Sequence, residues 1–552
     1  MLFPTFDFLV FVVPVMLVCW ALAHRPWPRT VFLLAASYFF YVAGPKTDPP
    51  STPGYFAFLL VFSTVLDYVS AGQIHRFAPD LASADPARVR KAQHVRRFFL
   101  GASLVGNLGM LGYFKYTDFF VKVGSDLGRA LGYDIPPIVI DVVLPVGISF
   151  YTFQSLSYTL DVWRGQLTPE PSFLKFALFV TFFPQLVAGP IVRASEFLPQ
   201  LHRRLKLHPR FMDEGLFRVF KGLFKKVVLG DWVAAQLTDA VFASPENYTA
   251  LEILIALYAF TLQLYADFSG YSDIAIGIAR MLGFELPENF DRPHQARNIG
   301  EFWRRWHMTL STWLRDYLFF PLGGSRGTPA RVYFNLWATM FLVGMWHYSP
   351  GTSWNFVIYA NLQAGAILFN RWNKIRKRTG SLVRRGATIL GLACGTAAAL
   401  GALGYWALDL NAMQTGVLMA IACLAFLVVT WLPITDHPLN VALHIVLTFH
   451  FTVVTRIFFR AESFDVAQRM LSGLLTFDGH GMRPGFVSPW VWAALLFGVV
   501  YHYTPKAWVD VELFRWFRRI PGPVLGVLLA LFSLGLMKLM EGTPRAFIYF
   551  QF

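Results

Sequence analysis

Two histidines, each preceded by a tryptophan, stand out in a strongly apolar chain. His307 ends the string WRRWH, and His347 ends the string GMWH just before a break rich in proline and glycine. A neutral imidazole at such a break can face a water-filled cavity and accept a proton from an attacking hydroxyl, because its pKa lies near neutral pH. One histidine would act as the base while the other orients the nucleophile or polarises a carbonyl. The alternative for each is a buried histidine that only makes structural hydrogen bonds.

The stretch 301–317 predicts a polar helix around the first of these histidines. On such a helix the histidine shares a face with Ser311, four residues later. On another stripe, Arg305 or Arg315 could pair with Asp316. A helix that is polar on several sides should be enclosed by other helices rather than by lipid.

Two carboxylates form a second polar cluster, inside the apolar run that follows residue 250. Asp267 and Asp273 lie six residues apart, which does not put both on one face of a helix. A break at Gly270 could still bring both toward one cavity. Ionisable groups in a membrane are costly, so each is a candidate functional residue, and the alternative is a pair of buried acids satisfied by hydroxyls or arginines. The residues expected to support the two histidines are Trp303, Arg304, Arg305, Trp306, Ser311, Arg315, Asp316, Trp346, Asn355, Asp267 and Asp273.

The composition shows what kind of chain must position these residues. Hydrophobic residues make up 55% of the 552 residues and charged residues only 15%, against about 25% in a soluble globular chain. The chain is therefore too apolar for a soluble enzyme or a disordered protein. We expect an all-α polytopic integral membrane protein with roughly 11–14 transmembrane helices plus re-entrant segments, forming one membrane-embedded domain over residues 1–552.

The apolar and basic segments also predict the topology. Leu2–Ala23 is long enough to cross a bilayer, whereas Phe173–Pro190 is interrupted by prolines and reads as a re-entrant or broken segment. Lysine and arginine cluster in the short stretches 75–97, 193–226, 371–385 and 506–519. The positive-inside rule places these clusters in the cytoplasm and both termini on the other side. Because the net charge of +15 is spread over short loops, we expect no nucleic-acid partner, although some clusters could attract an anionic cytosolic ligand.

Several kinds of site are excluded by what the sequence lacks. The three cysteines, Cys19, Cys394 and Cys423, are far apart and form no Cys-x-x-Cys or Cys/His cluster. No P-loop, His-Glu-x-x-His pair or Gly-x-Ser-x-Gly elbow is present. We therefore expect no disulfide framework, no metal site and no permanently bound cofactor.

Long strings in the chain resemble the membrane-bound O-acyltransferase (MBOAT) family, specifically its bacterial alginate O-acetylation branch. The resemblance covers nearly the whole chain, and its longest string is LPENFDRPHQARNIGEFWRRWHMTLSTWLRDYLFFPLGG at 286–324. The other strings are LPVGISFYTFQSLSYTLDVWRG (144–165), FFPQLVAGPIVR (182–193), GLFKKVVLGD (222–231), FSGYSDIAIGIARMLGF (268–284), GMWH (344–347) and FIYFQF (547–552).

This resemblance implies an enzyme and its partners. The family fold would be a helical bundle around a central polar tunnel, with N-terminal membrane helices in 1–160, the catalytic core in 161–370 and C-terminal membrane helices in 371–552. The family's catalytic histidine corresponds to His347, and its second motif histidine to His307. The implied reaction takes acetyl groups from cytosolic acetyl-CoA across the bacterial inner membrane for O-acetylation of an exported, alginate-like polysaccharide. Periplasmic acetyltransferases of the SGNH-hydrolase type would complete the transfer.

The sequence departs from the family pattern just after the second histidine. The family places a tryptophan four residues after this histidine, but here Trp354 follows it by seven, through an insertion within 348–353. Tyr359-Ala360 and Gln363 also replace the family's Trp-Gly and a nearby histidine. Other acyl groups such as D-alanyl and other polymers such as cellulose remain open, as does a transporter or flippase of lipid-linked sugars in which Asp267, Asp273 and the arginines at 304–315 bind substrate or ions.

Overall fold

Every regular element in the described part of the chain is a helix. The computed structural model describes residues 3–44, 54–133, 135–136, 142–187, 189–205, 208–348, 353–379, 393–396, 398–402, 404–405, 409–431, 436–476 and 479–539. No strand occurs in these ranges. A helix satisfies its backbone hydrogen bonds within one segment, which is what a hydrocarbon environment demands. The insertion residues 349–352, the apolar stretch at 388–392 and the terminal string 547–552 lie outside the described residues.

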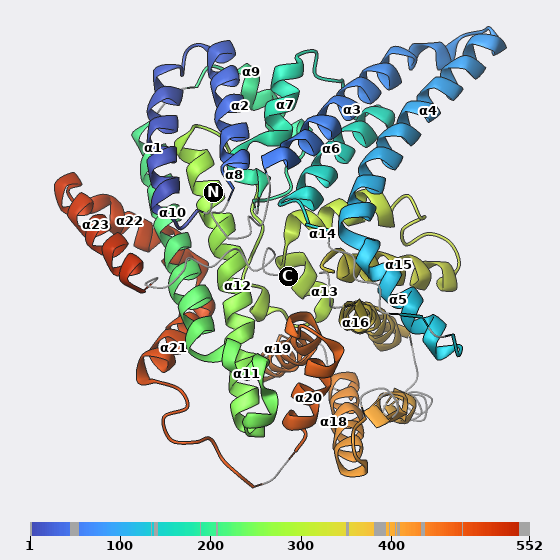
Figure 1. Ribbon diagram of the computed structural model, residues 1–552, viewed down its shortest axis with the longest axis vertical. Coiled ribbons are helices and arrows are strands. Elements are labelled where there is room, and N and C mark those ends of the chain that lie inside the picture. The colour runs from blue at the N-terminus through green and yellow to red at the C-terminus, as the bar shows by residue number, and fades with distance from the viewer. Residues whose placement is uncertain are drawn as a thin grey trace. The chain divides into compact units, whose positions relative to one another are not determined.

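The α-helices follow one another along the chain as shown in Figure 1. They are α1 (Phe6–Ala21), α2 (Pro26–Val42), α3 (Ala57–Arg76), α4 (Pro86–Leu111), α5 (Thr117–Ala130), α6 (Ile148–Trp163), α7 (Phe173–Thr181), α8 (Phe183–Leu186), α9 (Ala194–His202), α10 (Pro209–Phe224), α11 (Asp239–Ala243), α12 (Ala250–Met281), α13 (Ile299–Arg305), α14 (Met308–Leu314), α15 (Pro329–Trp346), α16 (Ser353–Thr379), α18 (Ala412–Trp431), α19 (Pro438–Arg460), α20 (Phe464–Leu474), α21 (Pro489–Tyr503), α22 (Leu513–Arg519) and α23 (Gly522–Leu539).

Shorter helical segments of other types join them. The 3₁₀ turns are η1 (Gly54–Phe56), η2 (Pro79–Ala82), η6 (Pro245–Asn247) and η7 (Pro293–Gln295). The π-helical segments are η3 (Gly112–Tyr116), η4 (Lys225–Trp232), η5 (Ala234–Thr238), η8 (Arg315–Phe319) and η10 (Trp508–Glu512).

Local sequence explains where several of the helices begin. A side chain that accepts a hydrogen bond from the first turn is followed directly by proline in the pairs Asp85-Pro86, Thr328-Pro329 and Ser488-Pro489. The first residue satisfies one of the unpaired amide groups, and the proline has none to satisfy. The starts of α4, α15 and α21 are therefore encoded locally.

Five of the described helical stretches are long and apolar enough to cross a membrane. They are Gly54–Ala82, Ala250–Met281, Ala412–Thr430, Pro438–Arg460 and Gly522–Leu539. Few residues of helices α18 and α23 are buried, and most are partly or fully exposed, which suits contact with lipid. The expected class, an all-α polytopic membrane protein, is confirmed.

The chain divides into two compact units made of interleaved segments. The first contains Met1–Val228, Ala266–Asn289 and Pro505–Phe552, and the second contains Leu229–Tyr265 and Phe290–Thr504.

In the first unit a buried carboxylate joins three helices. Asp67 of α3 accepts hydrogen bonds from Ser103 and, at 2.8 Å, from Asn107 of α4, and at 2.9 Å from Thr159 of α6. Figure 1 shows α3 and α4 lying along each other with α6 beside them. Because a buried charge without hydrogen bonds is costly, this cluster fixes how the three helices pack.

The segment expected to be broken is broken in the first unit. Helix α7 ends at Thr181 and α8 starts at Phe183, with Phe182 between them in a non-helical conformation. The side chains of Phe179, Phe182 and Phe183 around the break are buried. The side-chain amides of Gln154 and Gln185 both donate to the carbonyl oxygen of Phe179. Protein therefore encloses the irregular backbone, as a bilayer requires.

Glycines allow α10 to approach the second half of α12 within the first unit. A β-carbon at Gly222 would lie 2.7 Å from the carbonyl oxygen of Gly270, and one at Gly215 would lie 2.6 Å from that of Gly277. The two glycines on each helix are seven residues apart, so they share one face. Small residues at this spacing let helix backbones come close together.

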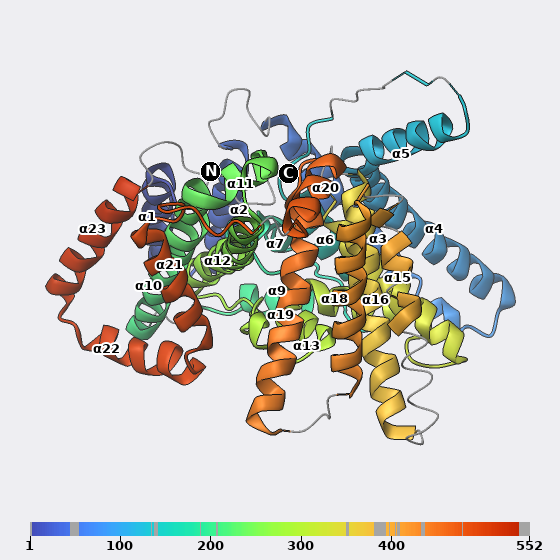
Figure 2. The same cartoon turned by 90° about the horizontal axis from the view of Figure 1, so that it is seen from below.

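In the second unit, α16 lies beside both α15 and α19. Figure 2 shows α16, α18 and α19 running side by side, and α18 also contacts α19. The C-terminal end of α15, the first half of α16 and the C-terminal end of α19 carry residues of the site described next.

Candidate active site

His307 lies at a sharp change of chain direction rather than within one helix. Helix α13 ends at Arg305, Trp306 is extended, and His307 has the left-handed backbone angles φ 43° and ψ 56° before α14 begins. The expected single polar helix over 301–317 is therefore wrong. A non-glycine residue in this region costs on the order of 1–2 kcal/mol, and such strain is common at functional sites.

His347 caps the C-terminal end of α15, and a backbone hydrogen bond orients its ring. Nδ1 lies 2.7 Å from the carbonyl oxygen of Val343, one turn earlier. A carbonyl oxygen can only accept, so Nδ1 carries the proton and Nε2 carries the lone pair of the neutral ring. His347 is 4% exposed.

Trp346 contacts both histidines. Its ring centroid lies 5.5 Å from that of His307 and 4.9 Å from that of His347, in edge-to-face contacts. His307 is fully buried and lies outside the five candidate membrane spans. Burial, followed by the nearby His347, holds the pKa of His307 well below its ordinary value. Its imidazole is therefore neutral at neutral pH.

The end of α15 that carries His347 is placed by close contact with α16. A β-carbon at Gly344 would lie 2.4 Å from the β-carbon and 2.5 Å from the α-carbon of Ala360. Only glycine at position 344 permits this approach.

Trp303 lies beside His347, and Asn355 is anchored to the residue that follows α19. The Trp303 ring centroid is 6.5 Å from that of His347, and its indole donates to Gln363 at 3.2 Å. Asn355 is fully buried and donates to the carbonyl oxygen of Ala461 at 2.9 Å. Each side chain therefore connects the site to a helix distant in the sequence.

The other charged candidates near His307 lie toward the surface. Arg304 and Arg315 are exposed. Arg315 pairs with Asp316 at 2.8 Å, one of the two expected pairings, whereas Arg305 pairs with Glu301 at 2.8 Å. The hydroxyl of Ser311 lies 3.4 Å from the carbonyl oxygen of Trp306, one end of the break at His307. These residues stabilise the turn rather than surround the histidine rings.

Arg456 of α19 is a buried residue that our sequence reasoning missed. Its guanidinium carbon lies 4.8 Å from the Trp306 ring centroid and 5.9 Å from that of Phe459, and the residue is 3% exposed. Phe459 in turn contacts His347, with ring centroids 5.7 Å apart. An arginine inside an apolar run is the signal that could have identified it.

The first unit holds Asp267 and Asp273, and both are buried ion-pair partners. Helix α12 continues without a break at Gly270, so each acid meets its own lysine: Lys226 pairs with Asp267, and Lys225 lies 2.6 Å from Asp273. The alternative of satisfied buried acids is thus the arrangement found, although lysines supply most of the compensation.

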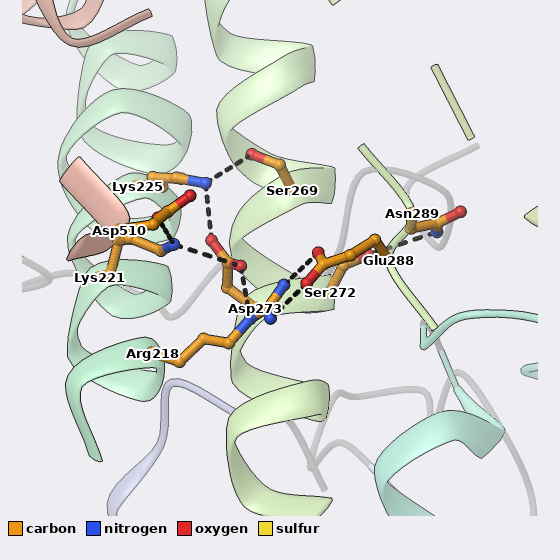
Figure 3. Close-up of polar contacts among 9 residues, drawn as sticks. All are labelled: Arg218, Lys221, Lys225, Ser269, Ser272, Asp273, Glu288, Asn289 and Asp510. Carbon is orange, nitrogen blue, oxygen red and sulfur yellow. Dashed lines mark hydrogen bonds and ion pairs between the residues drawn. The ribbon is translucent and has the colours of Figure 1, made fainter. Parts of the chain in front are cut away.

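Further charges surround Asp273, as Figure 3 shows. Arg218 lies 2.9 Å from Asp273 and also pairs with Glu288, while Lys221 pairs with Asp510 at 3.0 Å. Arg218, Lys221 and Lys225 recur at three and four residues, so one face of α10 and the start of η4 carries all three cations. Within the residues that the structure describes, no group of three or more His, Cys, Asp or Glu side chains could hold a metal ion.

Comparison with known proteins agrees with the motifs around the two histidines. The sequence profile of the family described as "MBOAT, membrane-bound O-acyltransferase family" matches residues 166–389. The chain is 41% identical over 361 residues to the probable alginate O-acetylase AlgI of Pseudomonas aeruginosa, covering 65% of this chain and 64% of that protein. The corresponding protein of Pseudomonas putida is 38% identical over 361 residues, covering 65% and 68%.

A relative named after a different acetyl acceptor is also similar. The peptidoglycan O-acetyltransferase of Helicobacter pylori is 35% identical over 377 residues, covering 64% of this chain and 66% of that protein. The match spans less than two thirds of the Pseudomonas aeruginosa protein. The profile match and the extent of these similarities show that this chain belongs to the membrane-bound O-acyltransferase family.

Proposed function

We propose that this protein takes acetyl groups from cytosolic acetyl-CoA and passes them through the membrane for O-acetylation of an exported, alginate-like polysaccharide. The observation that carries this proposal is the pair of buried histidines that both contact the Trp346 ring, with Nε2 of His347 holding the lone pair. The names of the relatives, alginate O-acetylase and peptidoglycan O-acetyltransferase, support acetyl as the acyl group and a polysaccharide as the eventual acceptor.

In this proposal His347 acts as the general base. Nε2 accepts the proton of an acceptor hydroxyl while the hydroxyl oxygen attacks the thioester carbonyl. The C–O bond forms, the C–S bond breaks, and the proton passes from Nε2 to the departing thiolate. An acyl relay fits the same atoms: Nε2 attacks the thioester carbonyl, the C–S bond breaks and coenzyme A leaves as its thiolate. The acceptor oxygen then takes the acetyl group from the acylated imidazolium, which returns to the neutral ring, and the hydroxyl proton ends on the thiolate. His307 orients the acceptor or polarises the carbonyl in either route.

The remaining assignments follow from the same reaction. The protein lies in the bacterial inner membrane with both termini in the periplasm, and basic cytoplasmic stretches attract the phosphates of acetyl-CoA. A periplasmic SGNH-type acetyltransferase completes transfer to the polymer. The supporting roles of Trp303, Trp306, Trp346 and Asn355 are part of this proposal.

The test is acetyl transfer from labelled acetyl-CoA to a hydroxyl acceptor by the purified protein. The wild type should transfer label, the His347→Ala variant should lose transfer at wild-type expression, and His94→Ala, an exposed histidine of α4, should behave like the wild type. Wild-type rates in His347→Ala would reject this catalytic assignment.

A transporter or flippase of lipid-linked sugars is the competing function. It would use the buried acids Asp267 and Asp273, but both are compensated by Lys225, Lys226 and Arg218, which argues against a substrate site there. This alternative would be favoured if reconstituted protein moved a lipid-linked sugar with no acyl donor present and showed no acetyl transfer. Transfer of D-alanyl groups, or acetylation of cellulose, would appear in the same assay with the donor or polymer exchanged.

A further inference from the structure

A buried hydrogen-bond chain links three helices and begins at Trp303, which lies beside His347. The indole of Trp303 in α13 donates to Oε1 of Gln363 in α16 at 3.2 Å, and Nε2 of Gln363 donates to the hydroxyl oxygen of Thr455 in α19 at 3.1 Å. Thr455 completes the chain by donating to the carbonyl oxygen of Thr452 at 3.1 Å. Trp303, Gln363 and Thr455 are each at most 5% exposed.

The order of donors along this chain requires a side chain like glutamine at its centre. The indole of Trp303 can only donate a hydrogen bond. The hydroxyl of Thr455 already donates its proton to a backbone carbonyl, so it can only accept from the central residue. That residue must therefore accept a hydrogen bond at one end and donate one at the other. A buried polar group that loses its partner costs about 1–3 kcal/mol. Gln363 therefore fixes the direction in which the Trp303 ring points.

The Trp303 ring limits the freedom of the candidate base. His347 is held at one nitrogen by Val343, a contact that still permits the ring to tilt. Trp303 packs on one side of this ring at 6.5 Å, Trp346 at 4.9 Å and Phe459 at 5.7 Å. Displacement of one of these rings would let the imidazole move away from the reacting hydroxyl.

We infer that Gln363 is a positioning residue, which acts through Trp303 to hold the His347 ring in its reactive orientation. This inference rests on the proposed function, since it assumes that His347 takes part in acyl transfer. A displacement of about 1 Å at a reacting group can lower a rate by on the order of 100-fold. We therefore expect Gln363→Leu to lower kcat for acetyl transfer by about 10- to 100-fold, with KM for acetyl-CoA changed less than threefold.

Gln363→His provides a rescue that a merely structural role does not predict. A neutral imidazole has one N–H and one lone pair, so it can accept from Trp303 and donate to Thr455. Protonation removes the lone pair, and burial lowers the pKa of an imidazole as it does at His307, so the variant should approach the wild-type rate at neutral pH and lose it only well below about pH 6.5. The wild-type amide does not titrate in this range, so the variant should gain a limb in its pH–rate profile.

A matched control separates positioning from stability. Gln414 of α18 is also a buried glutamine with a full set of hydrogen bonds, to Ser472 and Thr476. Gln414→Leu should lower the melting temperature of the protein without changing kcat. If Gln363→Leu does not fold, Thr455→Val tests the same chain, because it leaves the amide in place and removes its acceptor.

The outcomes distinguish this inference from the proposed function. Loss of transfer in His347→Ala together with a wild-type kcat in Gln363→Leu, or a kcat loss no larger than that of Gln414→Leu, would overturn the positioning role alone. A Gln363→His variant with the pH–rate profile of the wild type would do the same. Absence of acetyl transfer in the wild type would instead overturn the proposed function.

Discussion

Val343 and His347 are joined by a 2.7 Å hydrogen bond between the carbonyl oxygen of the first and Nδ1 of the second. Helix α15 ends here, so the carbonyl belongs to the group of C-terminal carbonyls that lack a helical amide partner. The helix end therefore selects the tautomer of the imidazole. Nε2 is left as the basic nitrogen, and no carboxylate is needed at Nδ1 to fix this tautomer.

An asparagine at position 347 should distinguish the role of Nδ1 from that of Nε2. The amide nitrogen of His347→Asn lies close to the position of Nδ1 and can still donate to Val343, but nothing replaces Nε2. We expect expression and melting temperature close to the wild type and a rate of acetyl transfer lower by about 10²- to 10⁴-fold. Detergent-purified protein would be compared by thermal unfolding and by label transfer, and a variant that keeps more than a tenth of the activity would contradict the assignment of Nε2.

A methyl group at Gly344 should disturb the site without disrupting the fold elsewhere. Gly344→Ala would force α15 away from Ala360, because the new β-carbon would overlap atoms 2.4 and 2.5 Å away. The backbone must move by several tenths of an ångström or more, and His347 moves with it. We expect a loss of acetyl transfer of at least tenfold and a destabilisation of about 1–3 kcal/mol.

Gly365 provides the matched control for this prediction. It lies in α16 and has no atom within 4 Å of the position of its β-carbon. Gly365→Ala should keep the wild-type rate and raise stability by about 0.5–1 kcal/mol, since alanine favours a helix. Equal activity in the two variants would show that the α15–α16 contact does not place the histidine.

The sequence predicted the class of the fold from its composition, and local motifs singled out two histidines that the structure brings into contact with one tryptophan. The apolar composition requires helices in a membrane, and the Trp-His pairs identified His307 and His347. The direction of the chain at His307 was not predictable, because helical periodicity continues through a residue whose backbone turns left-handed. Partners distant in the sequence were not predictable either: Lys226 meets Asp267 only because glycines bring two helices into contact, and Arg456 reaches Trp306 only through the packing of α19.

Because the backbone at His307 is left-handed, the His307→Gly variant should be more stable than the His307→Ala variant. Both His307→Gly and His307→Ala remove the imidazole, so both should lose acetyl transfer. Glycine adopts φ 43° without strain, whereas alanine retains the penalty, so the glycine variant should be more stable by about 1 kcal/mol. In a helix interior the order would be reversed. Thermal unfolding of the two variants measures the sign, and a more stable alanine variant would show that α13 and α14 form one helix in solution.

The ion pair between Lys226 and Asp267 should contribute to stability only while both partners are present. Both side chains are at most 3% exposed, and the lysine also lies 5.3 Å from the ring of Tyr271. Removal of one partner leaves a buried charge without compensation, so Lys226→Met should cost about 3–5 kcal/mol. Replacement of the pair by Lys226→Met and Asp267→Leu removes both charges and should recover most of that loss.

The exposed pair of Arg515 and Glu512 serves as the control for this ion pair. The guanidinium nitrogen of Arg515 lies 2.7 Å from the carboxylate oxygen of Glu512, but the two side chains are 55% and 40% exposed. Solvent screens such a pair, so Glu512→Gln should change stability by less than about 1 kcal/mol. Denaturant-induced unfolding of the single and double variants would measure all of these differences. A double variant as unstable as Lys226→Met would show that Asp267 contributes through its other contacts rather than through the lysine, and that the pair does not hold α12 against η4.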